Sequence, residues 1–400
     1  MHLLTIFFLS LLLCSLEEEP SESFLGNLAP VIQSIQKERG FPLDFPNRGD
    51  LTAAEWTRAG RQKLQVYLSY TPESVPLDIK VHKVHRREHY ETRLISFAGT
   101  KHYRVPAYLL VPTTGEGPFP GVVALHDHSG RFYHGKEKLV RLENEHAALR
   151  SFRENYYGGR TYADELAKLG FVVIVPDAFY WGDRRVQYVN PPKSLQRLTD
   201  GLDPSSVEYV RAVNRFLSDQ APILNTWLSF AGTSWMGIVN YDDRLCVDVL
   251  QSMEEVDTEN IGCLGLSGGG YRSTYLTGME PRIKASVIVG WMASLPTTVG
   301  MSRPVHRSLF DAFGVHAFLD HPDIASLAAP HCRVFVQNCA RDVLFTREGM
   351  EEAALKIRLV YQQLGYPERF DSRFYDVPHQ FNTEMQEDAF RWLQRWLEKK

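Results

Sequence analysis

The sequence predicts an α/β protein with a mostly parallel central sheet, helices on both faces of the sheet and a helical N-terminal extension. Two observations carry this prediction. Short apolar segments alternate with loop-and-helix segments over most of the chain, which is typical of parallel strands joined by crossover helices. Most of these segments are continuously apolar, as expected for strands covered on both faces. With 44% hydrophobic and 23% charged residues in 400, the composition is that of an ordinary globular protein.

The N-terminus resembles a targeting segment. Residues 3–13 form an apolar run that is too short to span a bilayer but has the length of a signal-peptide core. We predict a signal peptide over residues 1–16, and hence a secreted or periplasmic protein without a stable membrane span. No Lys or Arg precedes the run, and the first basic residue is Lys37, so a cytoplasmic protein is the alternative.

Residues 17–78 are predicted to form the helical extension, and residues 79–400 the α/β domain. Thr52 and Glu55 have the spacing of a capping box at the start of a helix. Residues 93–97 and 103–111 are predicted to form an antiparallel hairpin at the edge of the sheet.

Six core strands follow the hairpin. We place them at residues 121–125, 171–175, 261–266, 285–289, 334–337 and 373–375, with a crossover helix at 163–169. The stretch between residues 180 and 260 is longer than a simple crossover needs, and we expect it to shape the functional site.

Charge and cysteine content exclude several classes of function. The formal net charge is -4, with 44 Lys+Arg against 48 Asp+Glu spread along the chain, which does not predict a nucleic-acid-binding surface. Local basic pairs such as Arg86-Arg87 and Arg184-Arg185 are expected to be solvated. The five cysteines have no metal-binding spacing. We therefore predict no metal and no cofactor, and the sequence does not indicate an oligomeric state.

The motif Gly265-Leu-Ser267-Gly-Gly269 lies directly after the strand predicted at 261–266 and before a predicted helix. In a nucleophile elbow a serine occupies a strained strand-to-helix turn, and the residues two before and two after it must be small. Both of these positions are glycine. The motif and its setting predict the α/β-hydrolase fold with Ser267 as nucleophile, because no phosphate-loop ending follows.

A serine nucleophile needs a base and a group that orients the base, and this fold orders them as Ser, acid, His. His379 is the histidine that follows the last predicted strand, so we predict it as the base. Asp342 comes just beyond the strand predicted at 334–337, where catalytic groups collect, and is our predicted acid. Asp376, and less so Asp371, remain alternatives.

The oxyanion of acyl transfer needs backbone N–H donors. Gly268, directly after the nucleophile, is predicted to supply one, and the loop after the first parallel strand, His126-Asp127-His128, the other. Either Asp127 or His128 fits that role. The same three residues could also be metal ligands, but alternate residues at a strand end point to opposite sides and no second cluster of ligands is evident.

Several stretches resemble a known family. They are 232–237, 255–257, 265–271, 281–285, 290–292 and 320–330. Together they resemble bacterial acetyl xylan esterase-like α/β-hydrolases, related to the dienelactone hydrolase group, from residue 79 to the C-terminus. The resemblance implies that Ser267, Asp342 in Asp342-Val-Leu-Phe345 and His379 are catalytic. Dienelactone hydrolases proper carry cysteine at the elbow, so the serine favours ordinary ester cleavage.

The sequence thus predicts a serine-dependent carboxylic ester hydrolase that works through an acyl-enzyme, with a carbohydrate or other small-molecule ester as substrate and residues 79–400 as the catalytic domain. Two alternatives remain. One is a serine peptidase like the prolyl oligopeptidases, and the other is a catalytically silent relative that binds a carbohydrate or a partner.

Overall fold

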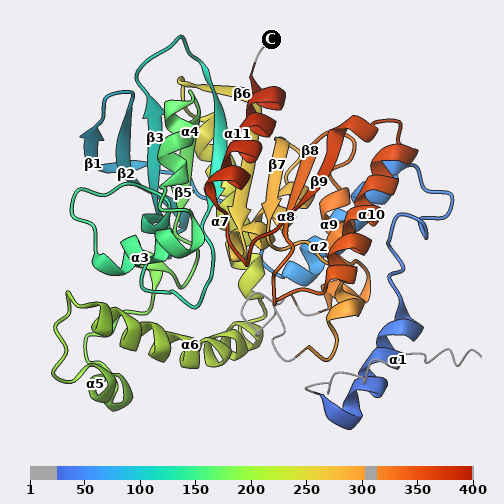
Figure 1. The fold of residues 1–400 in the computed structure, drawn as a ribbon, viewed down its shortest axis with the longest axis horizontal. Helices are drawn as coiled ribbons and strands as arrows, with labels where there is room; N and C mark the ends of the chain where they lie inside the picture. The colour runs from blue at the N-terminus through green and yellow to red at the C-terminus, as the bar shows by residue number, and fades with distance from the viewer. Residues whose placement is uncertain (1–24, 302–311, 313, 399–400) are drawn as a thin grey trace, which may run out of the picture.

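In the described part of the chain, a nine-stranded sheet forms the centre of the molecule (Figure 1). The computed structural model describes residues 25–301, 312 and 314–398. The predicted signal peptide, residues 1–16, lies outside these ranges. The strands are β1 Lys80–Arg86, β2 Tyr90–Thr100, β3 Tyr103–Pro112, β4 Phe119–Leu125, β5 Val172–Pro176, β6 Val256–Leu266, β7 Ile283–Val289, β8 Arg333–Cys339 and β9 Phe370–Tyr375.

The strand order is β1-β2-β3-β5-β4-β6-β7-β8-β9. The pairs from β5 through β9 are parallel, whereas β1, β2 and β3 pair antiparallel with one another and β3 with β5. The predicted mostly parallel sheet is therefore confirmed, and the predicted antiparallel hairpin is present as β2 and β3, one strand in from the edge. β1 was not predicted. Its Lys-Val-His-Lys pattern leaves nearly all of its side chains exposed, which suits a charged edge strand that discourages further pairing.

Helices cover both faces of the sheet (Figure 1). They are α1 Ala29–Arg39, α2 Ala53–Leu68, α3 Ala147–Tyr156, α4 Tyr162–Lys168, α5 Lys193–Thr199, α6 Val207–Phe230, α7 Trp235–Gln251, α8 Gly268–Met279, α9 His321–Ser326, α10 Arg347–Gln363 and α11 Thr383–Leu397. Alternate residues of one strand enter different cores. In β4, Val123 packs in the core that contains α7 and α8, and Val122 in the core that contains α4 and α11.

Between residues 25 and 78 the structure has the helices α1 and α2. α2 begins at the capping box, in which Glu55 N donates to Thr52 Oγ1 at 3.3 Å and Thr52 N to Glu55 Oε2 at 2.9 Å. Trp56 and Leu64 of α2 are buried in the same core as the sheet, and Arg61 Nε donates to Gly278 O of α8 at 2.7 Å. The extension thus packs against the helix that follows the elbow.

The parallel strands end together at one edge of the sheet. In their register, Leu125 of β4 is opposite Gly265 of β6, and Leu266 is opposite Val289 of β7. The loops that leave these strands therefore start side by side, which is where ligands bind in open α/β sheets. Within the described ranges, no helix is both long and apolar enough to cross a membrane.

Candidate active site

Ser267 lies between β6 and α8 in a backbone conformation that side chains rarely adopt, with φ 57° and ψ -119°. Such strain is typical of functional turns and costs about 1–3 kcal/mol. The neighbouring glycines are required by close backbone contacts. A Cβ atom on Gly265 would lie 2.5 Å from the carbonyl carbon of Gly269, and one on Gly269 would overlap the carbonyl oxygen of Leu125. The turn therefore has the geometry of a nucleophile elbow.

His379 and Asp342 form a hydrogen-bonded pair. Nδ1 of His379 lies 2.6 Å from Oδ2 of Asp342, whose side chain is fully buried. The other oxygen of Asp342 accepts from Leu344 N at 2.9 Å. Among the residues that the structure describes, Nε2 of His379 is buried and has no hydrogen-bond partner. This nitrogen is the atom that a catalytic base would use.

The alternative acids point elsewhere. The Asp376 side chain is 88% exposed and forms an ion pair with Arg341 at 3.1 Å. Asp371 is paired with Arg373 at 3.4 Å. Of the three candidate acids, Asp342 is the one that the structure brings to His379. Asp376 and Asp371 pair with arginines instead.

The His379 imidazole lies against the strand next to the elbow. A Cβ atom on Gly290 would lie 3.3 Å from Cε1 and 3.4 Å from Nδ1 of His379. The residue before Gly290 is Val289, whose carbonyl accepts from Ser267 N at 2.9 Å. Ser267 and His379 are thus both held at the end of β7.

The amide of His128 is beside Gly268. A Cβ atom on Gly268 would lie 2.8 Å from His128 N, a contact that only glycine allows. Of the two residues that the sequence left open as second oxyanion donor, His128 is therefore the one whose N–H lies next to the first. Asp127 is engaged differently, since its Oδ1 accepts from Tyr157 Oη at 2.6 Å.

The buried side chain of Lys138 donates to a backbone carbonyl of the same loop. Lys138 Nζ donates to Asp127 O at 2.8 Å and lies 3.5 Å from Asp127 Oδ2. Asp127 O belongs to the peptide unit whose N–H is that of His128. On the other side of the loop, Arg272 of α8 forms two hydrogen bonds with Asp243, at 3.0 and 2.6 Å, and its third nitrogen lies 3.5 Å from His126 O. Sequence reasoning missed both cations, because only the fold brings them to this loop.

Both ring nitrogens of His126 form hydrogen bonds with the backbone. Its Nδ1 lies 3.0 Å from Asp127 O, and its Nε2 accepts from Ala178 N at 3.1 Å. Burial, together with the nearby charges of Arg272 and Lys138, lowers the pKa of His126 well below its ordinary value. The imidazole is therefore neutral, with its proton on Nδ1, and neither nitrogen faces outward as a metal ligand would.

Three acidic residues form a cluster near this loop. In the described part of the chain, Glu137, Asp177 and Asp183 bring carboxylate oxygens within 4.8 Å of one another. Lys136 Nζ pairs with all three, at 2.7, 2.8 and 2.6 Å. Although burial lowers the pKa of Lys136, the three carboxylates raise it well above its ordinary value. The ammonium already occupies the centre that a metal ion would need.

Aromatic side chains surround the loop after β4. His128 meets the ring of Trp181 edge-on at 5.5 Å, and Trp181 packs on Trp235 at 5.7 Å. Near the elbow, Tyr271 lies 4.6 Å from Trp291. Trp181, Trp235, Tyr271 and Trp291 are at most 4% exposed and belong to the hydrophobic core. Arg184, expected to be solvated, is instead buried and paired with Asp242 at 2.7 Å, because α7 brings that carboxylate to it.

Comparisons with known proteins agree with this architecture. No family model matches the chain. The chain is 24% identical over 346 residues to "Putative hydrolase YtaP" of Bacillus subtilis, covering 84% of this chain and 98% of that protein. In structure it matches a "putative acetyl xylan esterase" of Bacteroides fragilis with a TM-score of 0.65 and 17% identity, covering 86% and 81% of the two chains.

A glucuronoyl esterase from Solibacter usitatus also matches, with a TM-score of 0.60 and 10% identity, covering 88% of this chain and 93% of that one. The chain has the α/β-hydrolase fold. In structure the chain resembles proteins named acetyl xylan esterases, in agreement with the resemblance found in its sequence motifs.

Proposed function

We propose that this α/β-hydrolase is a serine-dependent carboxylic ester hydrolase, with Ser267 as nucleophile, His379 as base and Asp342 as the acid that orients the base. The observation that carries the proposal is the His379–Asp342 contact of 2.6 Å beside the strained turn of Ser267. A carboxylate on Nδ1 fixes the tautomer in which Nε2 is a proton acceptor.

The reaction follows from these roles. Nε2 of His379 takes the hydroxyl proton of Ser267 while Oγ bonds to the ester carbonyl carbon, and the carbonyl oxygen becomes an oxyanion. The tetrahedral intermediate then breaks its bond to the alcohol oxygen, which receives the proton from Nε2. The resulting acyl-enzyme is hydrolysed by water through the same base, releasing the carboxylic acid and restoring Ser267.

The oxyanion would be held by the amides of Gly268 and His128, whose backbones lie against each other. We assign Lys138 as a positioning residue for this hole. Its ammonium is bonded to the carbonyl of the 127–128 peptide, at the end opposite the N–H that faces the site. A cation there fixes the orientation of the peptide and increases the partial positive charge on its N–H, and such preorganised donors contribute strongly to acyl transfer.

The substrate class is proposed from the comparisons. Structures that share this fold over most of the chain are named acetyl xylan esterases and glucuronoyl esterases. We therefore favour removal of acetyl groups from carbohydrate esters.

A substrate screen tests this assignment. Acetic acid release from acetylated xylo-oligosaccharides would be compared with hydrolysis of p-nitrophenyl acetate, of longer p-nitrophenyl esters and of a proline p-nitroanilide. We expect turnover of the acetyl esters and none in the Ser267→Ala variant. Turnover of the anilide above the acetates would instead support the peptidase alternative.

A further inference from the structure

Tyr157, the residue directly after α3, binds the loop of the proposed oxyanion hole from inside the protein. Its Oη donates to Oδ1 of Asp127 at 2.6 Å, and both residues are at most 1% exposed. A hydroxyl this close to a carboxylate forms one of the stronger hydrogen bonds in proteins. Burial and the charge of Asp127 raise the pKa of Tyr157 well above its ordinary value, so the hydroxyl keeps its proton and remains a donor.

This hydrogen bond acts on the peptide that presents the His128 N–H. Asp127 directly precedes His128, and Lys138 Nζ donates to the carbonyl oxygen of Asp127 at 2.8 Å. The carbonyl and the side chain of Asp127 are thus both held, which fixes the torsion that aims the next N–H. An oxyanion donor stabilises the transition state best when its direction is fixed before the charge develops. Tyr157 therefore supports the donor that lies beside Gly268.

The end of α3 also binds the loop that carries the base. Tyr156 O accepts from the backbone N of Phe381 at 2.8 Å, and Phe381 comes two residues after His379. Gln386 of α11 is fully buried, and its Nε2 donates to Tyr157 O at 2.9 Å and to Phe381 O at 2.7 Å. Three hydrogen bonds therefore join the end of α3 to the His379 loop, directly or through Gln386.

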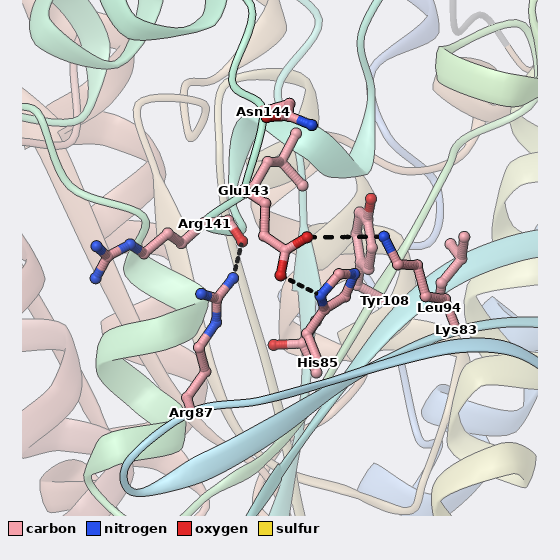
Figure 2. Close-up of a pocket in the computed structure, with 10 residues that line it drawn as sticks. Lys83, His85, Arg87, Leu94, Tyr108, Arg141, Glu143 and Asn144 are labelled. Carbon is pink, nitrogen blue, oxygen red and sulfur yellow. Dashed lines mark hydrogen bonds and ion pairs between the residues drawn. The ribbon is translucent and has the colours of Figure 1, made fainter.

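α3 is itself anchored to the rest of the protein. In the segment before the helix, Glu143 pairs with His85 of β1 at 2.8 Å, in the pocket that Figure 2 shows. Within the helix, the buried Arg153 donates from Nε to Lys138 O at 2.9 Å. The helix that leads to Tyr157 is thus tied both to the edge of the sheet and to the segment that carries Lys138.

The sheet alone does not bring the two loops together. The loop of the oxyanion hole follows β4 and the loop of the base follows β9, and four strand-to-strand steps separate these strands. At the usual spacing of neighbouring strands, four steps correspond to about 19 Å. Acyl transfer needs the His128 N–H and the His379 imidazole at one carbonyl group, and a misplacement of about 1 Å can cost about 100-fold in rate. A direct link between the loops therefore bears on the rate.

We propose that Tyr157 is a positioning residue, which holds the oxyanion hole and the base in fixed relative positions. Its hydroxyl fixes Asp127, and its backbone carbonyl is joined through Gln386 to the loop of the base. This inference rests on the proposed serine esterase function. A tyrosine that only filled the core would stabilise the fold without favouring the transition state over the bound substrate.

Tyr157→Phe tests the proposal, because it removes one oxygen atom and keeps the ring in the core. We expect kcat for p-nitrophenyl acetate to fall by about 10–100-fold while KM changes less than twofold, since the oxyanion donors act in the transition state. The inhibition constant of phenylboronic acid, which forms a tetrahedral adduct with an active-site serine, should rise by a similar factor.

Tyr361→Phe is the matched control. It also removes a fully buried hydroxyl, which donates to Cys332 O at 2.8 Å. Cys332 directly precedes β8, whereas the proposed site lies where the strands end, so this hydrogen bond is at the opposite edge of the sheet. Tyr361→Phe should leave kcat and the phenylboronic acid inhibition constant unchanged.

A double-mutant cycle shows whether Tyr157 acts through Asp127. Asp127→Ala removes the acceptor, and combining it with Tyr157→Phe should cost no more in kcat than the slower single variant does. Asp127→Asn keeps an oxygen that accepts from the hydroxyl, so it should recover most of the rate that Asp127→Ala loses. Single effects that multiply in the double variant would overturn the proposal.

Ser267→Ala separates this inference from the esterase proposal. If turnover requires Ser267 but Tyr157→Phe keeps kcat within twofold, or loses no more than Tyr361→Phe, the positioning role is wrong and the esterase proposal stands. Turnover that persists in Ser267→Ala would overturn the esterase proposal, and this inference with it.

Discussion

Asp342 and His379 are 37 residues apart in the chain, yet Oδ2 of the first lies 2.6 Å from Nδ1 of the second. The loops after β8 and β9 bring them together, since these two strands are parallel neighbours and end at the same edge. Asp342 keeps its side chain fully buried, and its second oxygen is held by Leu344 N. The protein itself therefore holds the pair in the arrangement that the proposed reaction needs.

This relationship predicts different outcomes for two aspartates. Asp342→Asn should lower kcat for p-nitrophenyl acetate by about 10³–10⁴-fold, because an amide favours the wrong imidazole tautomer. Asp376→Asn should leave kcat within about twofold, since that side chain is 88% exposed and paired with Arg341. Equal losses in the two variants would show that the acid has been misassigned.

Lys138 is predicted to act on the rate and not on ground-state binding. Lys138→Met should lower kcat by about 10–100-fold while KM changes little, because the His128 peptide loses the cation bonded to its carbonyl side. Lys138→Arg should recover part of the rate. Steady-state kinetics on folded protein, checked by circular dichroism, measures this; a rise in KM at constant kcat would point to a purely structural role.

Gly269→Ala should unfold or strongly destabilise the protein, by more than about 4 kcal/mol, because the new methyl group would overlap the Leu125 carbonyl oxygen. Gly232 is a matched control, since its added Cβ meets nothing within 4 Å. Gly232→Ala should cost about 1 kcal/mol through its positive φ alone. Urea denaturation of both variants compares the costs, and similar midpoints would contradict the tight turn.

His134 is predicted to make stability depend on pH. Burial lowers the pKa of His134 from 6.5 to about 4, so the folded state binds its proton less readily than the unfolded state does. The stabilisation is complete above pH 6.5 and is lost as the pH falls toward 4, by at most about 3 kcal/mol. His134→Gln should lose less stability over this window in urea titrations. Parallel losses in variant and wild type would exclude His134 as the cause.

The sequence predicted features that local patterns encode. Continuous apolar runs marked the parallel strands, and the two glycines around Ser267 marked the elbow. The exposed strand β1 was not predicted, because its alternating charged and apolar residues bury almost nothing. Such a strand is held by backbone pairing with β2, and side-chain periodicity does not report backbone pairing.

The buried lysines near the site could not be predicted from local sequence patterns. Lys138 and Lys136 stand in a short Gly-Lys-Glu-Lys segment that resembles a solvated turn, yet both are buried. The carboxylates Asp177 and Asp183, which bind Lys136, follow β5 some forty residues later, and the packing of that strand beside β4 brings them to this lysine. The choice between Asp127 and His128 likewise depended on which amide faces Gly268.

Labelling with a fluorophosphonate, followed by mass spectrometry of the modified peptide, tests whether Ser267 is a nucleophile activated by His379. We expect a single stoichiometric adduct on Ser267 in the wild type, and strongly slowed labelling in His379→Ala because Nε2 no longer takes the proton. An unmodified Ser267, or an adduct at the same rate without His379, would contradict this expectation.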